Sequence, residues 1–391
     1  MHIGFHPILP SWQGGLNYLR NLLFALHSTY GGQIQRSLFI PQGTAKEAYA
    51  ALLPFCNEPI VYQVDQSSRL SKRIIEKIQQ RRGQMVTTIV NPSLEQHLQH
   101  QGCQVFFMNN LHYHLSTPSL SWIPDFQHLH LKHLFNSEQL RRRDQAFLQR
   151  SRLANQLILS SKNARSDFLK FAPNYADKAQ LLHFVAQIDP AIYTSETQTI
   201  CAKYRLPERF VYFPGQFWQH KNHTVAFDAV RILRARGIDI TLVCTGPLSD
   251  YRQPLYFSSL IQKLTDDDIR DRVIILGLLP YLDIQALMRQ SVCTLNPSLF
   301  EGWSTTVEEA KTLGKCTVLS DIAVHQEQNP SQARYFAANS SEALADVLGD
   351  VWKTIPAGPD LDLEREARVN LPQRTRRVAE SFLQIAQAAA G

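Results

Sequence analysis

The chain has 391 residues, of which 44% are hydrophobic and 19% are charged. This length suits two globular domains, and the composition excludes an intrinsically disordered chain. The first residues lack the basic start and long apolar stretch of a secretory signal, and no window is apolar over the length needed to span a bilayer. We therefore expect a cytoplasmic protein.

The net charge of +6 is unevenly distributed. Residues 1–190 contain 19 Lys and Arg against 11 Asp and Glu, a net charge of +8, whereas the remainder has 21 against 23, a net charge of −2. A basic first half can attract a phosphorylated acceptor or the inner face of an anionic membrane, so weak peripheral membrane contact is one expectation. The alternative is that the arginines at 81–82 and 141–143 are solvated helix faces. Aromatic residues are not interleaved with these charges, which argues against nucleic acid as a partner.

Short apolar runs alternate with helical patterns over almost the whole chain. Continuous apolar runs are typical of parallel strands covered on both faces, and their alternation with helices indicates an α/β fold with doubly wound sheets. The expected strands are residues 3–8, 37–40, 60–64, 105–108 and 156–160, followed by 210–214, 240–245, 273–276, 292–296 and 317–320. The expected helices are residues 15–27, 70–82, 222–236, 281–289, 306–312 and 373–389.

A polar stretch at residues 188–198 separates two strand–helix series. We therefore place a first Rossmann-like domain at residues 1–190, a second at 191–365, and a terminal helical segment at 366–391 that returns to the first domain. Six cysteines lie far apart, without the close spacing of a zinc or redox motif, and we expect buried, reduced thiols.

Residues 296–310 join the end of an apolar strand to a helix. In parallel α/β sheets, ligands bind beyond the carboxyl ends of the strands, where this loop should lie. Thr305, followed three residues later by Glu308, predicts a capping box at the helix start. The unpaired amides of that first turn, with the helix dipole behind them, suit a diphosphate group.

Two other glutamates belong to the same segment. With Glu308 occupied in capping, Glu309 is available to accept bonds from two neighbouring hydroxyls, as on a ribose. Glu301 lies on the loop and can do the same for a sugar ring, while Gly302 lets the backbone approach a ligand closely. The alternative is an ordinary strand–loop–helix unit whose acidic residues face solvent.

A second segment, residues 213–223, joins the first strand of the second half to its helix. Asn222 is the predicted N-cap, and Lys221 stands just before the helix start, where its charge adds to that of the helix. We expect an anion site there. The alternative is a solvated lysine at a helix end.

These motifs resemble glycosyltransferase family 4, the retaining enzymes of GT-B fold among the group 1 glycosyltransferases. Glu301 and Glu309, separated by seven residues, are similar to the paired glutamates of that family. Gly215, followed six positions later by Lys221, is similar to its phosphate-binding segment. The departure is Gln216, where many relatives carry arginine, so either phosphate binding depends on Lys221 or Gln216 belongs to a different subfamily.

The resemblance implies a GT-B protein with two Rossmann-like domains, a central cleft and a C-terminal helix on the first domain. It implies transfer of a hexosyl or other sugar from a UDP- or GDP-linked donor to a hydroxyl of a glycan, lipid or small molecule, with no cofactor. By the same resemblance, Glu301 holds the transferred sugar and Glu309 the ribose. The amides around Trp303, Ser304 and Thr305 hold the sugar and phosphates. Metal independence follows if a lysine and helix dipoles replace the cation.

Two elements of the first half complete the predicted site. Gly14 and Gly15 precede a helix in a pattern that is not the dinucleotide-binding Gly-x-Gly-x-x-Gly, and family 4 enzymes have a similar glycine loop facing the donor. Turn geometry is the alternative. Asp125 and His128 follow a short strand, where related enzymes often have a His-Asp pair. We expect Asp125 first, and His128 second, to position the acceptor hydroxyl, with a surface location of His128 as the alternative.

The predicted catalytic residues are therefore Asp125, His128, Lys221 and Glu301. His112 and His114 alternate, but no third ligand has recognisable spacing, so no metal site is expected. Two other functions remain open on the sequence: a nucleotide-sugar epimerase of the same architecture, and a non-catalytic subunit that binds nucleotide sugar.

Overall fold

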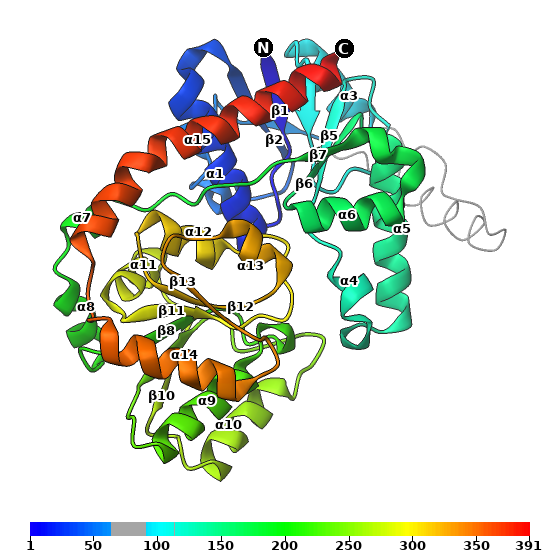
Figure 1. Cartoon of the computed structure of the whole chain (residues 1–391). Coiled ribbons are helices and arrows are strands. Elements are labelled where there is room, and N and C mark those ends of the chain that lie inside the picture. Colours follow the sequence, from blue (N-terminus) through cyan, green and yellow to red (C-terminus); the bar gives the residue numbers. More distant parts are fainter. Residues whose placement is uncertain (64–90, 113) are drawn as a thin grey trace. The chain divides into compact units, whose positions relative to one another are not determined.

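A computed structural model of the chain describes residues 1–63, 91–112 and 114–391 (Figure 1). The expected helix at 70–82 and the arginines at 81–82 lie outside these residues. The chain forms two compact units. The first consists of Met1–Phe126, Ser137–Phe184 and Arg374–Gly391, and the second of Gln127–Asn136 and Val185–Gln373. The boundaries predicted from the sequence follow residues 190 and 365, and they keep residues 127–136 with the first domain.

The first unit contains a parallel sheet that has seven strands within the described residues, in the order β3-β2-β1-β4-β5-β6-β7. Its strands are β1 (His2–Phe5), β2 (Gln35–Pro41), β3 (Ile60–Tyr62), β4 (Val105–Phe107), β5 (Ser119–Ile123), β6 (Gln156–Leu159) and β7 (Ala179–Leu181). Its helices include α1 (Gln13–Tyr30), α3 (Pro92–His100), α5 (Ser137–Leu153) and α6 (Lys162–Phe171), with short 3-10 turns η1 (Gly31–Gln33), η2 (Lys46–Tyr49), η3 (Leu53–Phe55) and η5 (Pro173–Lys178).

The second unit contains a parallel sheet with the order β10-β9-β8-β11-β12-β13 among the described strands. These strands are β8 (Val211–Pro214), β9 (Leu242–Thr245), β10 (Val273–Gly277), β11 (Cys293–Asn296), β12 (Thr317–Ser320) and β13 (Ala333–Phe336). The helices are α4 (Gln127–His130), α7 (Pro190–Thr194), α8 (Thr197–Tyr204), α9 (His223–Ala235), α10 (Tyr256–Asp266), α11 (Tyr281–Gln290), α12 (Thr305–Thr312), α13 (Ala323–Gln328) and α14 (Ser341–Thr354), with η4 (Lys132–Leu134) and η6 (Gln219–Lys221). The predicted α/β fold with two doubly wound parallel sheets is confirmed.

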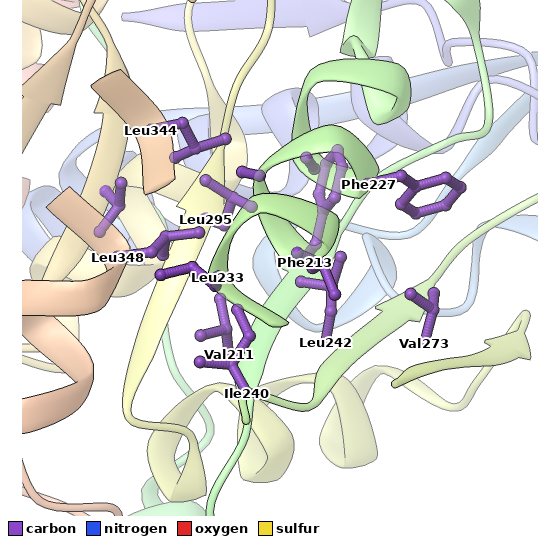
Figure 2. Packing of buried hydrophobic residues seen from close by; sticks show 14 of the residues in the cluster. Val211, Phe213, Phe227, Leu233, Ile240, Leu242, Val273, Leu295, Leu344 and Leu348 are labelled. Atoms are coloured by element: carbon purple, nitrogen blue, oxygen red, sulfur yellow. The ribbon is translucent and has the colours of Figure 1, made fainter. Parts of the chain in front are cut away.

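Alternate strand residues of the second unit bury against opposite helix layers, as the two-residue period of a strand requires. Val211 and Phe213 of β8 and Leu242 of β9 belong to one cluster with residues of α9, α10 and α14. Figure 2 shows this cluster, in which side chains of α9 and α14 pack over those of the strands. Tyr212 and Val243 point the other way, into a cluster with α8, α11 and α12. Because both faces are covered, these strands read in the sequence as continuous apolar runs.

The last helix, α15 (Leu361–Ala390), belongs to both units. The unit boundary follows Pro372, which lies inside the helix. Beyond it, Phe382 is fully buried and stacks on Phe5 of β1, with ring centroids 6.0 Å apart. It also meets Phe107 of β4 edge-on. The expected return of the C-terminal helix to the first domain is therefore confirmed (Figure 1).

All six cysteines lie in the described part of the chain and are unpaired. Four are buried, as predicted: Cys201, Cys244, Cys293 and Cys316. The other two are partly buried, and burial raises the pKa of the Cys56 and Cys103 thiols to about 12. No helix within the described residues is both long and apolar enough to cross a membrane.

Candidate functional site

The strand order of the second unit reverses between β8 and β11, which are neighbours in the sheet. Loops that leave such neighbouring strands run to opposite sides, and ligands of open α/β sheets bind in the crevice that results. The loop after β8 and the loop after β11 meet there, because the Leu299 amide donates to the His220 carbonyl at 2.8 Å. Residues 213–223 and 296–310, the two segments predicted to bind the ligand, therefore lie together at one edge of the same sheet.

Lys221 and Glu301 form an ion pair across this crevice. The Lys221 Nζ lies 2.6 Å from Glu301 Oε1, and the two side chains are 18% and 10% exposed. The Ser298 hydroxyl donates to the same oxygen at 2.6 Å. Burial alone would raise the pKa of Glu301, but the Lys221 charge outweighs it and lowers that pKa to about 2. The site therefore holds an ionised carboxylate and a lysine with further N–H groups to donate.

The local structure around Lys221 differs from the N-cap prediction. Lys221 ends η6, and Asn222 follows with a left-handed φ of 62°. Asn222 occupies the N-cap position, but its side chain does not cap α9. It donates instead to the carbonyls of Pro297, at 3.2 Å, and Ala338, at 3.0 Å. Asn222 therefore ties the loop after β8 to the loop after β11, which fixes the position of Lys221.

The predicted capping box at Thr305 and Glu308 is wrong. Ser304 is the N-cap of α12, and its hydroxyl accepts from the Val307 amide at 3.3 Å. Glu308 is buried and accepts from the side-chain amide of Gln328 at 3.2 Å. Serine is as good an N-cap residue as threonine, so Ser304 can replace Thr305 in this role. The local sequence also does not show that Glu308 bonds to Gln328, which is 20 residues away.

The first turn of α12 keeps amides for a ligand. The Ser304 amide donates to the Gln328 side chain at 3.2 Å, whereas the amides of Thr305 and Thr306 meet no acceptor within the described residues. These two N–H groups, together with the helix dipole, form an anion-binding end. Gly302 and Trp303, predicted donor contacts, are partly buried on the loop just before it.

Glu309, on the same helix, is buried rather than solvent-facing. The Tyr281 hydroxyl, at the start of α11, donates to Glu309 Oε1 at 2.6 Å. Burial raises the pKa of Glu309 to about 7, and the Tyr281 bond acts in the opposite direction. Tyr281 was not predicted from the sequence. It follows β10 at the same carboxyl edge, and that position is the signal that could have identified it.

Gly215 and Gln216, the other predicted donor residues, lie in the turn after β8 and are both partly buried. The Gly215 carbonyl faces Gly246, the residue after β9, so closely that a Cβ on Gly246 would stand 2.1 Å from that oxygen. Gly246 has φ +133°. The close approach that needs a glycine is therefore at position 246, and it supports the Gly215 turn.

His128 belongs to the second unit, on α4, and is fully buried, so the surface alternative for it is wrong. The same short segment contacts the loops of the candidate site. Gln127 accepts from the Arg252 guanidinium at 2.9 Å, and the His130 ring lies 5.1 Å from that of Phe300, which precedes Glu301.

Asp125, Gly14 and Gly15 belong to the first unit. Asp125 lies 3.9 Å from an Arg143 nitrogen. Gly14 is exposed in the first turn of α1, whereas Gly15 is buried, and a Cβ on it would meet the Trp12 indole at 2.5 Å. Packing against Trp12 is thus one physical reason for glycine at position 15. No group of three or more His, Cys, Asp or Glu in the described part of the chain could hold a metal ion.

The comparisons with known proteins bear on this second unit. Residues 198–354 match the model of the family "Glycosyl transferases group 1". The matched range contains Gly215, Lys221, Glu301 and Glu309, so the loops after β8 and β11 fall within it. None of the curated proteins compared with the chain matches it in sequence.

Solved structures resemble the chain over nearly its whole length. Anabaena Alr3699/HepE in complex with UDP and glucose has a TM-score of 0.67 and 15% identity, covering 98% of each chain. The same protein in complex with UDP-glucose has a TM-score of 0.66 and 16% identity, covering 99% of this chain and 98% of that one. Sucrose-phosphate synthase from Thermosynechococcus elongatus has a TM-score of 0.61 and 14% identity, covering 99% and 98%. At these identities the likeness shows the fold, and the predicted GT-B fold is confirmed.

Proposed function

We propose that this protein is a family 4, retaining glycosyltransferase that moves a sugar from a nucleotide diphosphate sugar to an acceptor hydroxyl. The observation that carries the proposal is the placement of Lys221, Glu301 and Glu309 on the loops and helix that follow β8 and β11, where the strand order reverses. The match of residues 198–354 to the group 1 family model supports it.

The donor would span the site from the ribose to the transferred sugar. Glu309, buried beside Tyr281, accepts the two ribose hydroxyls, and the Thr305 and Thr306 amides receive a phosphate. Lys221 donates to the diphosphate while keeping one N–H on Glu301. Glu301 then accepts hydroxyls of the sugar. Gln216 lacks a charge, so Lys221 supplies the side-chain cation on this loop.

Cleavage of the bond between the sugar and the diphosphate leaves negative charge on the departing diphosphate. Lys221 and the α12 amides stabilise this developing charge, so they stabilise the transition state more than the bound donor. By analogy with family 4, an oxygen of the leaving phosphate takes the proton of the acceptor hydroxyl as the new bond forms on the same face. No metal is required in this scheme, and unchanged turnover in excess chelator is the corresponding expectation. A UDP-linked donor is favoured because Anabaena HepE is described with UDP and UDP-glucose.

The first unit would supply the acceptor side. Asp125 remains the first candidate for orienting the acceptor hydroxyl, with Gly14 and Gly15 facing the donor. His128, which belongs to the second unit, remains the second candidate. Weak contact between the basic first half and an anionic membrane also remains a prediction. It is tested by binding to anionic liposomes, which should fall as salt rises.

The experiment that tests the function is product analysis by NMR. The protein is incubated with UDP- and GDP-linked sugars, with and without a panel of glycan, lipid-linked and small-molecule acceptors. We expect release of nucleoside diphosphate that depends on the acceptor, and a product with the anomeric configuration of the donor. Isomerised donor without acceptor would establish the epimerase instead. Donor binding without transfer or slow hydrolysis would establish the binding subunit.

A further inference from the structure

The guanidinium of Arg150 is the feature of the first unit that the proposed chemistry leaves unexplained. Arg150 lies on α5 and donates to the Asn110 side chain at 3.2 Å and, more weakly, to the Trp122 carbonyl at 3.4 Å. Its Nε is shielded from solvent and has no partner within the described residues. The Phe147 ring lies against the group, 5.3 Å from its central carbon.

Among the described residues, none of the groups that Arg150 contacts carries a negative charge. Burial lowers the pKa of Arg150 to about 10, and the next largest influence on it is Arg143, a second cation. Asp125 lies 3.9 Å from Arg143, and both of those side chains are partly exposed. The group is partly exposed, but its Nε is shielded and has no partner among the described residues, so it keeps an N–H donor for an anion supplied from outside.

The Arg150 guanidinium lies where we expect the first unit to bind a ligand. Asn110 follows β4, and Trp122 is near the end of β5, so the guanidinium reaches the carboxyl edge of the sheet. The strand order reverses next to β4, between β1 and β4. Asn109 adds a side-chain oxygen that is shielded and has no hydrogen-bond partner in the described structure. That oxygen suits a hydroxyl next to the anion.

We propose that Arg150, with Arg143 beside it, binds an oxyanion of the acceptor, a phosphoryl or carboxylate group, while Asn109 accepts from a neighbouring hydroxyl. The assignment of the anion to the acceptor rests on the proposed function, but the anion site itself does not. A guanidinium suits both a phosphoryl and a carboxylate group, because its parallel N–H bonds can donate to two oxygens of either group. The acceptor is then a sugar phosphate, a phospholipid-linked sugar or a sugar acid rather than a neutral sugar.

The first test measures anion binding without catalysis. Thermal stabilisation by inorganic phosphate and by acetate is recorded at constant ionic strength, relative to chloride, for the full-length protein. Arg150→Gln removes the positive charge but keeps a polar side chain. Arg150→Lys keeps the charge but lacks the paired N–H donors of the guanidinium. Arg142→Gln is the matched control, since it removes an exposed charge paired with Glu138 on the same helix. Lys221→Met removes the cation of the donor site in the other unit.

We expect phosphate or acetate to stabilise the wild type and Arg142→Gln alike, and Lys221→Met to lose only the part of the phosphate effect that the donor site contributes. In Arg150→Gln the apparent affinity should fall about tenfold or more, the usual effect of losing a charge-assisted hydrogen bond, with a smaller fall in Arg150→Lys. Circular dichroism checks that each variant is folded. Equal stabilisation of Arg150→Gln and the wild type, or loss in Lys221→Met alone, overturns the site.

The second test uses transfer. Sugars and their phosphate monoesters, and sugars and the matching uronic acids, are compared as acceptors in pairs. We expect the charged member to be preferred by the wild type and by Arg142→Gln, and the preference to be reduced about tenfold in Arg150→Gln. A wild-type preference for neutral sugars overturns the assignment of the anion to the acceptor. Absence of transfer to every acceptor with the anion site intact contradicts the proposed function, not the site.

Discussion

Glu309 has a carboxyl group whose charge depends on pH near neutrality. Burial raises its pKa to about 7 in the protein without donor, while ribose hydroxyls need the ionised form as their acceptor. Donor affinity should therefore rise about tenfold between pH 6 and pH 8 and then level off, because the ionised fraction rises by about that factor. Calorimetry with a nucleotide diphosphate sugar in two buffers should show proton release at pH 6. Glu309→Gln should bind weakly and independently of pH, whereas a pH-dependent affinity in that variant would exclude Glu309 as the group that titrates.

Tyr281 holds the carboxylate of Glu309 through its hydroxyl, at 2.6 Å. Tyr281→Phe removes a bond that lowers the pKa of Glu309, so the midpoint of the pH dependence should move upward. Donor affinity at pH 7 should fall about fivefold, the effect of one hydrogen bond of about 1 kcal/mol. Tyr335→Phe is the control, because that hydroxyl donates to the His325 carbonyl instead. An unchanged midpoint in Tyr281→Phe would show that the hydroxyl does not act through Glu309.

The sequence supplied the residue types of the site but not their partners. Lys221, Glu301 and Glu309 were identified from spacing and from the rule that ligands bind at carboxyl ends of strands. The pairing of Lys221 with Glu301 was not predicted, because it joins residues 80 positions apart in the chain. The same holds for Glu308 and Gln328, whose contact replaced the expected capping role.

At the scale of elements, the turn after β8 is held in place by the turn after β9. Gly246 follows β9, and a Cβ on it would stand 2.1 Å from the Gly215 carbonyl oxygen, so Gly246→Ala forces the turn of the donor site to move. We expect a loss of about 2 kcal/mol or more in unfolding free energy and weakened donor binding. Gly237→Ala is the matched control. It has φ +72° but no atom within 4 Å of the new Cβ, so about 1 kcal/mol and unchanged donor binding are expected. Equal effects on donor binding would show that the close contact is irrelevant to the site.

Strands were predictable where both faces are covered. Each of the ten expected strands coincides with one in the structure, since a doubly covered strand is a continuous apolar run. The edge strands β7 and β13 were not expected, because their outer positions are partly exposed and their sequences, Ala-Gln-Leu and Ala-Arg-Tyr-Phe, are mixed. Helix α5 was not among the expected helices, because arginines and other polar residues dominate it, but a solvated helix face was the alternative given for the arginines at 141–143.

At the scale of the whole molecule, the chain passes between its two units more than once. The segment Arg374–Gly391 completes the first unit, although it follows the second in sequence. Phe382→Ala should therefore destabilise the first unit by about 3 to 5 kcal/mol, through the lost packing against Phe5 and Phe107. Hydrogen exchange should rise in β1 and β4 and stay unchanged in β8 and β11. Equal increases in both sheets would mean that the two units unfold as one.

The central claim is that Lys221 and the loops around it bind the diphosphate of a nucleotide sugar. Calorimetric titration of a UDP- or GDP-linked sugar into the wild type, Lys221→Met and Lys353→Met tests it most directly. Lys353 is an exposed lysine in the last turn of α14, so its loss changes the charge of the same unit away from the site. We predict that Lys221→Met weakens binding by about ten- to a hundredfold, while Lys353→Met binds as the wild type does. Equal affinities in all three proteins would contradict the claim.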